Sequence, residues 1–294
     1  MRIWVASSDY RDDVRLSKKI LTDRAEGYRK IRNTMRYALS NLYDFGPAKD
    51  AVAESDLLPL DQWALSKLDA LLTTVKRAYE TYEFHVVYHS IIDFCATDLS
   101  AIYFDIQKDN LYTGKKTGHA RRSAQTVMYR IAHDVLIALA PITSFTSEEA
   151  WESLPGRETS SIFLATFPAP KGVENEARVR DYDAIFEVRK GVLPLLEAAR
   201  RDKLIGKSLE ARVVLTATGP TADLLARYRT ALPELFIVSQ VELTEVASDK
   251  AQAMGALKAE VLPATGNKCP RCWAFRAEVA AAQSLCNRCT EAVG

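Results

Sequence analysis

Residues 28–42 read YRKIRNTMRYALSNL, and this stretch indicates the architecture of the first half of the chain. Apolar side chains return every three or four residues at Ile31, Met35, Leu39 and Leu42, a spacing that predicts an amphipathic α-helix. On a helical wheel the basic side chains occupy a different arc from the apolar ones. The stretch therefore predicts a helix with one face in a core and a separate basic stripe made of Arg29, Arg32, Asn33 and Arg36.

Further helices are expected after this stretch. Asp61 can cap a helix that carries leucines at helical spacing, and residues 85–106 and 119–139 each have one apolar face. Thr146 and Glu149 have the spacing of a capping box ahead of another helix. Residues 17–160 are therefore predicted to form an all-α bundle.

The second half of the chain has a different pattern. Residues 161–175 are rich in Pro, Ser and Gly and are expected to be a linker, and a long amphipathic helix is predicted over 176–202. The segments ARVVLTAT, LFIVSQVELT and ALKAEVLPA have the composition of strands, with a helix expected near 221–231. The predicted fold is mainly α: a helical bundle, a small α+β module at 176–264 and a four-cysteine zinc knuckle at 265–294.

Composition limits the classes of function. The 294 residues carry a net charge of +1, so nucleic-acid binding has to come from local basic patches. No segment is long and apolar enough for a membrane span, and the first residues do not have a signal-peptide pattern. Four of the five cysteines lie in the last 26 residues, which favours metal binding in a reducing compartment. A cytoplasmic location is expected.

The cysteines form two CxxC pairs, CPRC and CNRC, separated by thirteen residues. Each pair brings two thiolates to one side of a tight loop, and two pairs complete a tetrahedron of soft ligands around Zn²⁺. The predicted ligands are Cys269, Cys272, Cys286 and Cys289 of one structural zinc site with no open position. Two disulfides or four free thiols are the alternative. Cys95 lies on an apolar helix face and is expected to be a core residue.

Three features can contact nucleic acid. The basic stripe and a second group, Lys115, Lys116, Arg121 and Arg122, suit phosphate contacts, or they are solvated charges. Trp273 beside the knuckle arginines suits stacking on an unpaired base, or it packs against the preceding domain. His85 and His89 are four residues apart but have no evident third ligand, so packing is the expected role.

Several segments together resemble bacterial-type isoleucyl-tRNA synthetases, which are class I enzymes. The resemblance covers essentially the whole chain in the family's order, and the terminal knuckle is its most discriminating part. The segments that carry it are RIWVASSDYRDDVRLS, YRKIRNTMRYALSNL, YFDIQKDNLYT with ARRSAQTVMY, APITSFTSEEAWESLP, RDKLIGKSLEARVVL and NKCPRCW with LCNRC.

The resemblance implies a C-terminal portion of such an enzyme. Residues 1–16 would end the catalytic core and contact the tRNA stem, and the bundle would bind the anticodon side of isoleucine tRNA. The family's HIGH and KMSKS signatures and its editing domain are absent from this sequence, so the ATP site would lie in the absent core. The parent reaction would be ATP-dependent aminoacylation with isoleucine, which this chain alone is expected not to perform.

The resemblance also implies roles for single residues. The stripe residues match the family's KIRNT helix near the tRNA, and Lys115, Arg121 and Arg122 match its basic turn. Trp273 matches the residue that follows the second cysteine. Expected partners are isoleucine tRNA and the catalytic domain, in a monomer that does not bind membranes. The alternative function is a free-standing zinc-ribbon adaptor or a split-synthetase subunit that binds a partner protein.

Overall fold

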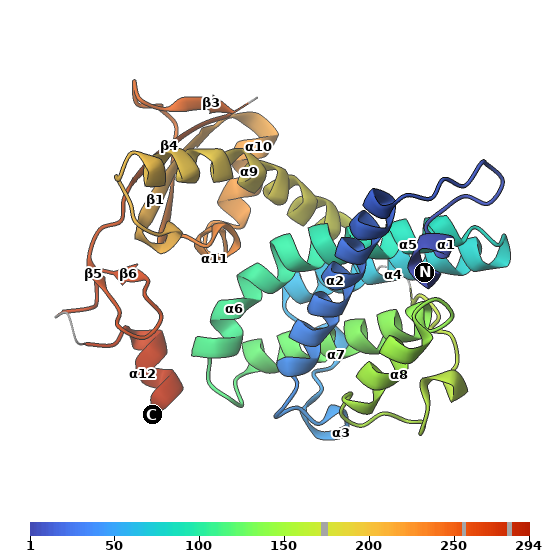
Figure 1. Cartoon of the computed structure of the whole chain (residues 1–294). Helices are drawn as coiled ribbons and strands as arrows, with labels where there is room; N and C mark the ends of the chain where they lie inside the picture. The colour runs from blue at the N-terminus through green and yellow to red at the C-terminus, as the bar shows by residue number, and fades with distance from the viewer. Residues whose placement is uncertain (172–175, 255–256, 281–283) are drawn as a thin grey trace. The chain divides into compact units, whose positions relative to one another are not determined.

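The computed structural model of this chain describes residues 1–171, 176–254, 257–280 and 284–294 (Figure 1). The chain divides into two compact units. Unit 1 contains Met1–Leu111 and Thr117–Glu176, and unit 2 contains Tyr112–Lys116 and Ala177–Gly294. The short segment Tyr112–Lys116 thus belongs to unit 2 although both of its flanks belong to unit 1.

Unit 1 is the helical bundle that the apolar periodicity predicts. Figure 1 shows its long helices α2, α4 and α7 with the shorter helices around them. In the described residues its elements are α1 (Arg2–Ala6), α2 (Lys18–Ser40), α3 (Pro47–Asp50), η1 (Glu54–Asp56), α4 (Pro59–Glu80), α5 (Phe84–Asp93), the π-helix η2 (Phe94–Tyr103), α6 (Phe104–Thr113), α7 (His119–Leu139), α8 (Ser144–Glu152) and η3 (Ile162–Leu164). The last two residues of α6, Tyr112 and Thr113, belong to unit 2.

The α2 helix begins where its sequence allows a cap. The Ser17 hydroxyl accepts a hydrogen bond of 3.2 Å from the Ile20 amide, which satisfies one of the unpaired N–H groups of the first turn. Ile31, Met35 and Ala38 are buried along one side of the helix. Gly27 permits a close approach to α5, because a Cβ atom there would lie 2.1 Å from the Tyr88 hydroxyl.

Two of the expected helix caps are wrong. Asp61 lies inside the first turn of α4, after Pro59, and its carboxylate points into the core, where it is fully buried. The α8 helix begins at Ser144, before Thr146, and the Thr146 hydroxyl hydrogen-bonds to Tyr28 instead of capping. In both cases a tertiary partner outcompetes the local hydrogen bond that the sequence spacing offers.

The predicted helix over 85–106 is continuous but not uniform. Its middle, Phe94–Tyr103, is a π-helix whose backbone bonds span five residues, flanked by α5 and α6. Within it the Ser100 hydroxyl donates to the carbonyl of Cys95 at 2.7 Å, and Thr34 of α2 contacts Ser100 at 3.2 Å. These hydroxyl contacts join the π-helix to α2.

Unit 2 is the predicted small α+β module followed by the cysteine-rich segment (Figure 1). Its elements in the described residues are α9 (Glu176–Arg201), η4 (Ser208–Glu210), β1 (Ala211–Ala217), α10 (Gly219–Arg227), α11 (Leu232–Phe236), β2 (Gln240–Thr244), β3 (Gln252–Met254), β4 (Leu257–Pro263), β5 (Asn267–Lys268), β6 (Phe275–Arg276) and α12 (Asn287–Val293).

The larger sheet has the strand order β2-β1-β4-β3. Strand β1 is parallel to β2 and antiparallel to β4, so that Val213 lies opposite both Val241 and Val261. Alternate residues of β1, namely Ala211, Val213 and Leu215, are buried, as expected for a strand with one face in a core.

The segment LFIVSQVELT is a strand only in its second half. Leu235 and Phe236 end α11, and Ile237 adopts a left-handed backbone conformation with φ of 56°, before β2 begins at Gln240. The apolar side chains Leu235, Phe236 and Val238 are buried in either case, so hydrophobicity alone did not distinguish helix from strand.

Within the described residues, no helix combines the length and apolarity required to cross a bilayer.

Candidate metal centre and nucleic-acid interface

The four terminal cysteines meet in one cluster. The sulfur atoms of Cys269, Cys272, Cys286 and Cys289 all lie within 4.8 Å of one another, and all four side chains are buried. All four are free thiols, so the disulfide alternative does not describe this structure. Within the part of the chain that the structure describes, this is the single His, Cys, Asp or Glu cluster with metal-binding spacing.

The cluster geometry suits a tetrahedral metal ion. Four sulfurs at about 2.3 Å from a zinc ion are separated by about 3.8 Å along each edge. The Cys272 and Cys286 sulfurs are 3.7 Å apart. All four ligand positions come from protein, so a metal held here would be structural and would not have an open position for a substrate.

Backbone groups help one of these thiols to ionise. Burial opposes ionisation of Cys269, but amide groups of Cys272, Cys286 and Arg271 that point at its sulfur lower its pKa to about 6. Burial raises the pKa of Cys272 to about 12. A divalent cation would reverse that effect, because metal binding deprotonates coordinating thiols.

A short hairpin frames the first cysteine pair. The Trp273 amide donates to the Cys269 carbonyl at 2.9 Å, and the Cys269 amide donates to the Ala274 carbonyl at the same distance. Strands β5 and β6 pair on either side of this turn. Gly266 has a φ of +91°, and a Cβ atom there would lie 2.6 Å from the Arg276 carbonyl oxygen, so the position requires glycine.

Trp273 lies at the tip of the CPRCW turn and is about half exposed. Its backbone is left-handed, with φ of 65°, which is uncommon for a large residue. The Lys207 amino group lies 4.9 Å from the centre of the indole ring, a cation–π contact. The ring therefore neither packs fully into the module nor stands alone in solvent.

The basic stripe on α2 is a solvent-exposed face. Arg29, Arg32, Asn33 and Arg36 are all exposed, whereas Ile31, Thr34 and Met35 between them are buried. Arg29 forms a local ion pair with Glu26. Arg32 and Arg36 form no ion pair with any residue that the structure describes, which leaves two guanidinium groups one turn apart.

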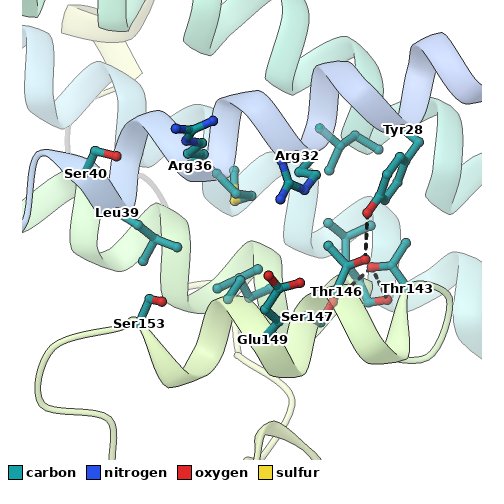
Figure 2. Close-up of a pocket in the computed structure, with 15 residues that line it drawn as sticks. Tyr28, Arg32, Arg36, Leu39, Ser40, Thr143, Thr146, Ser147, Glu149 and Ser153 are labelled. Carbon is teal, nitrogen blue, oxygen red and sulfur yellow. Dashed lines mark hydrogen bonds between the residues drawn. The ribbon is translucent and has the colours of Figure 1, made fainter.

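A groove separates α2 from α8 beside this stripe (Figure 2). It has a volume of about 290 Å³, with Ile31, Met35 and Leu139 among its apolar lining residues. Figure 2 shows Arg32 on the α2 wall and Glu149 on the α8 wall, with Ser40, Thr146 and Ser153 among the hydroxyl-bearing residues that line the groove. The hydrogen bond of 2.9 Å between Tyr28 and Thr146 joins the two walls.

The second basic group separates into buried and exposed members. Arg121 is buried and ion-paired with Asp44, and it also donates to the Leu111 carbonyl at 3.1 Å. Arg122 donates to the Asp44 carbonyl at 2.9 Å and pairs with Asp50 at 3.5 Å. Lys115 is exposed. These contacts favour a bracing role for the two arginines and leave Lys115 accessible.

Sequence reasoning did not find the partners of several of these groups. Asp44, which pairs with Arg121, is 77 residues away in sequence, and Lys207, which contacts the Trp273 ring, lies in a different segment from the knuckle. No local spacing links such pairs.

Cys95 is fully buried, as expected, and burial raises its pKa to about 12. His85 lies 3.6 Å from Asp9 and outside any metal cluster among the described residues.

Comparison with known proteins gives this geometry a context. Residues 61–215 match the family described as the anticodon-binding domain of tRNA ligase. The match covers more than half of the chain, so the chain belongs to that family.

The individual proteins that this chain resembles include several isoleucine–tRNA ligases. Isoleucine–tRNA ligase from Syntrophotalea carbinolica is 46% identical over 98% of this chain. The isoleucine–tRNA ligases from Symbiobacterium thermophilum and Carboxydothermus hydrogenoformans are 45% and 44% identical over 100% of it. The chain covers 32–33% of each relative, so it spans about a third of the length of the curated relatives it matches.

Proposed function

We propose that this chain is the tRNA-binding part of an isoleucine–tRNA ligase and contacts the anticodon side of isoleucine tRNA. The observation that carries the proposal is the anticodon-binding-domain match over 61–215, together with isoleucine–tRNA ligases that align with 98–100% of the chain. The parent reaction would be ATP-dependent attachment of isoleucine to its tRNA. The chain alone would not perform it, because its sequence contains neither HIGH nor KMSKS.

The proposed tRNA contacts are exposed cations and one exposed aromatic ring, which each unit contributes separately. Arg29, Arg32 and Arg36 with Asn33 form the α2 stripe, Lys115 lies on the segment before α7, and Trp273 lies on the knuckle. Arginine guanidinium groups donate hydrogen bonds to phosphate oxygens, and an indole ring can stack on an unpaired base. We assign Arg121 and Arg122 to holding the start of α7 and not to the tRNA surface, because their charges are met by Asp44 and Asp50.

The metal in the cysteine cluster would be one structural Zn²⁺. Four thiolates in a tetrahedral arrangement select zinc over the oxygen-preferring divalent cations. Its role would be to fold residues 266–294, which are too few to form an independent core. A cytoplasmic location, a monomeric state and a catalytic-domain partner complete the proposal.

A titration of the full chain with isoleucine tRNA at several salt concentrations tests the function. With four phosphate contacts from the exposed cations, log K should fall against log salt with a slope of about −3. A non-cognate tRNA should bind more weakly at every salt concentration. Equal affinity for both tRNAs would overturn the isoleucine assignment.

The same experiment separates the alternative function. A zinc-ribbon adaptor or split-synthetase subunit would bind a partner polypeptide and would show no tRNA affinity by itself. Absence of any salt-dependent tRNA binding would favour that alternative and would contradict the proposal.

A further inference from the structure

The segment Tyr112–Lys116 is held by the cysteine-rich knuckle. It is five residues long, it belongs to unit 2, and it carries the exposed side chains of Lys115 and Lys116. Its contact point is Thr113, to which two knuckle arginines donate hydrogen bonds. Arg271 donates to the Thr113 carbonyl, and Arg288 donates to the Thr113 hydroxyl at 3.0 Å.

The same nitrogen of Arg271 also faces the metal centre. Arg271 Nη1 lies 3.7 Å from the sulfur of Cys289, so one guanidinium group bridges a predicted metal ligand and the backbone of the segment. Arg271 follows Cys269 by two residues and precedes Cys272 directly. Its backbone is therefore fixed by the two cysteines on either side of it.

Arg288 is placed by the second cysteine pair. It lies in the first turn of α12 between Cys286 and Cys289, both of which are buried in the cluster. The α12 turn is tied to Cys286 by the hydrogen bond of 2.9 Å from the Thr290 amide to the Cys286 carbonyl. Each CxxC pair thus positions one arginine, and both arginines meet at Thr113.

The charges explain why a bound metal would strengthen this arrangement. One divalent cation with four thiolates leaves a net charge of −2 at the cluster (+2 − 4 = −2), which a neighbouring guanidinium partly offsets. A hydrogen bond from a cation to an anionic sulfur is stronger than one to a neutral thiol. Without the metal the short knuckle loses the constraint that places both arginines.

We propose that Arg271 and Arg288 are positioning residues that form a latch, through which the metal-loaded knuckle holds Tyr112–Lys116 and sets the position of Lys115 and Lys116. The consequence for tRNA rests on the function proposed above, but the latch itself does not. Loss of the metal releases the segment, so the knuckle acts on two basic residues that precede it by more than 150 positions in the sequence.

Trypsin cleavage of the full-length chain tests the latch without any RNA. Cleavage after Lys115 and Lys116, identified by mass spectrometry, should be slow in the zinc-loaded protein and about tenfold faster after a chelator removes the zinc. Arg271→Ala with zinc still bound should also be cleaved about tenfold faster, because the bridge is gone. Arg276→Ala is the matched control, since it removes an arginine from the same knuckle that does not contact Thr113.

A second variant keeps the test decisive if Arg271→Ala disturbs the knuckle. Thr113→Val lies outside the knuckle and removes the hydroxyl that accepts from Arg288. It should retain one zinc per chain and still raise the cleavage rate, although by less than Arg271→Ala. Wild-type cleavage rates in both zinc-loaded variants would overturn the proposal.

A double-mutant cycle in tRNA binding gives the functional readout. Arg271→Ala should weaken tRNA binding in the wild-type background but add little in a Lys115→Gln, Lys116→Gln background, because the latch acts through those lysines. Equal effects in both backgrounds would mean that Arg271 contacts tRNA directly, which contradicts the positioning role. If the wild type binds no tRNA at all, the function proposed above fails, and the cleavage assay still decides the latch.

Discussion

The phenol of Tyr103 donates a hydrogen bond of 2.5 Å to the carboxylate of Asp61 inside the bundle, and both side chains are fully buried. Gln107 donates to the same carboxylate oxygen at 2.7 Å, and Ser123 donates to the other oxygen. Three helical segments, η2, α6 and α7, therefore converge on one side chain of α4. Burial and the neighbouring carboxylate raise the pKa of Tyr103 well above its usual value, so Tyr103 stays a donor.

Removing this donor should destabilise the bundle. Tyr103→Phe leaves a buried carboxylate oxygen with one partner fewer, which should cost about 1–3 kcal/mol of unfolding free energy. Urea unfolding followed by circular dichroism measures the change. Tyr82→Phe is the control, because Tyr82 is largely exposed, and it should change stability by less than about 0.5 kcal/mol. Equal stability of the two variants would show that the buried contact contributes nothing.

The exposed and buried arginines should respond differently to truncation. Arg36→Ala should weaken tRNA binding and reduce the magnitude of the salt slope by about 1, with no loss of stability, since Arg36 has no ion pair among the described residues. Arg121→Ala should instead lower the unfolding free energy by about 3 kcal/mol, because it leaves Asp44 without its main partner. Salt-dependent titration and urea unfolding of both variants make the comparison. A loss of stability in Arg36→Ala, or a loss of tRNA binding without a loss of stability in Arg121→Ala, would contradict these roles.

His133 should make the stability of the bundle depend on pH. Burial lowers its pKa, but hydrogen bonds to Asp134 at 2.7 Å and Glu158 at 3.0 Å outweigh burial and raise the pKa above 6.5. The folded state therefore favours the protonated ring. The stabilisation is complete below about pH 6.5 and is lost as the pH rises through the raised pKa.

Thermal unfolding at a series of pH values from 6 to 8.5 measures this loss. The wild type should lose stability over that range, and His133→Gln should not show this part of the decline. His119→Gln replaces an exposed histidine of the same helix and should keep the wild-type profile. An unchanged profile in His133→Gln would rule out His133 as the titrating group.

The metal site should depend on all four cysteines. Elemental analysis should find one zinc per chain, and Cys286→Ser should release it and unfold residues 266–294 while the bundle stays folded. Cys95→Ala is the control, because Cys95 is buried away from the cluster, and it should retain the metal. Full zinc occupancy in Cys286→Ser would contradict the four-cysteine site.

Trp273 should contribute to tRNA binding through its ring. Trp273→Ala should weaken binding by about 1–3 kcal/mol, the range for losing one stacked base, while Trp273→Phe should lose less. Both variants should keep one zinc per chain, because the side chain points out of the cluster. If Trp273→Ala binds tRNA with wild-type affinity at low and moderate salt, Trp273 does not contact tRNA.

Periodic patterns in the sequence predicted the helices well. The apolar spacing of Ile31, Met35 and Leu39 predicted the face of α2 that packs in unit 1. A long helix was expected at 176–202, and the structure describes α9 over Glu176–Arg201. Helix starts were predicted less well, since Asp61 and Thr146 bind distant side chains instead of local amides. A capping residue has several possible partners, and the tertiary structure decides among them.

The sequence by itself determined the helical bundle, the small α+β module, the grouping of the four terminal cysteines and the separate arcs of basic and apolar residues on α2. These features depend on spacing along the chain, and backbone geometry turns spacing directly into position. Only the tertiary structure decided which cations stay accessible. Arg121 and Lys115 belong to one basic group in the sequence, but Asp44 pairs with the first and the second stays exposed. Only the tertiary structure brought Arg271 and Arg288 to Thr113, because contacts between distant residues depend on packing that no local pattern encodes.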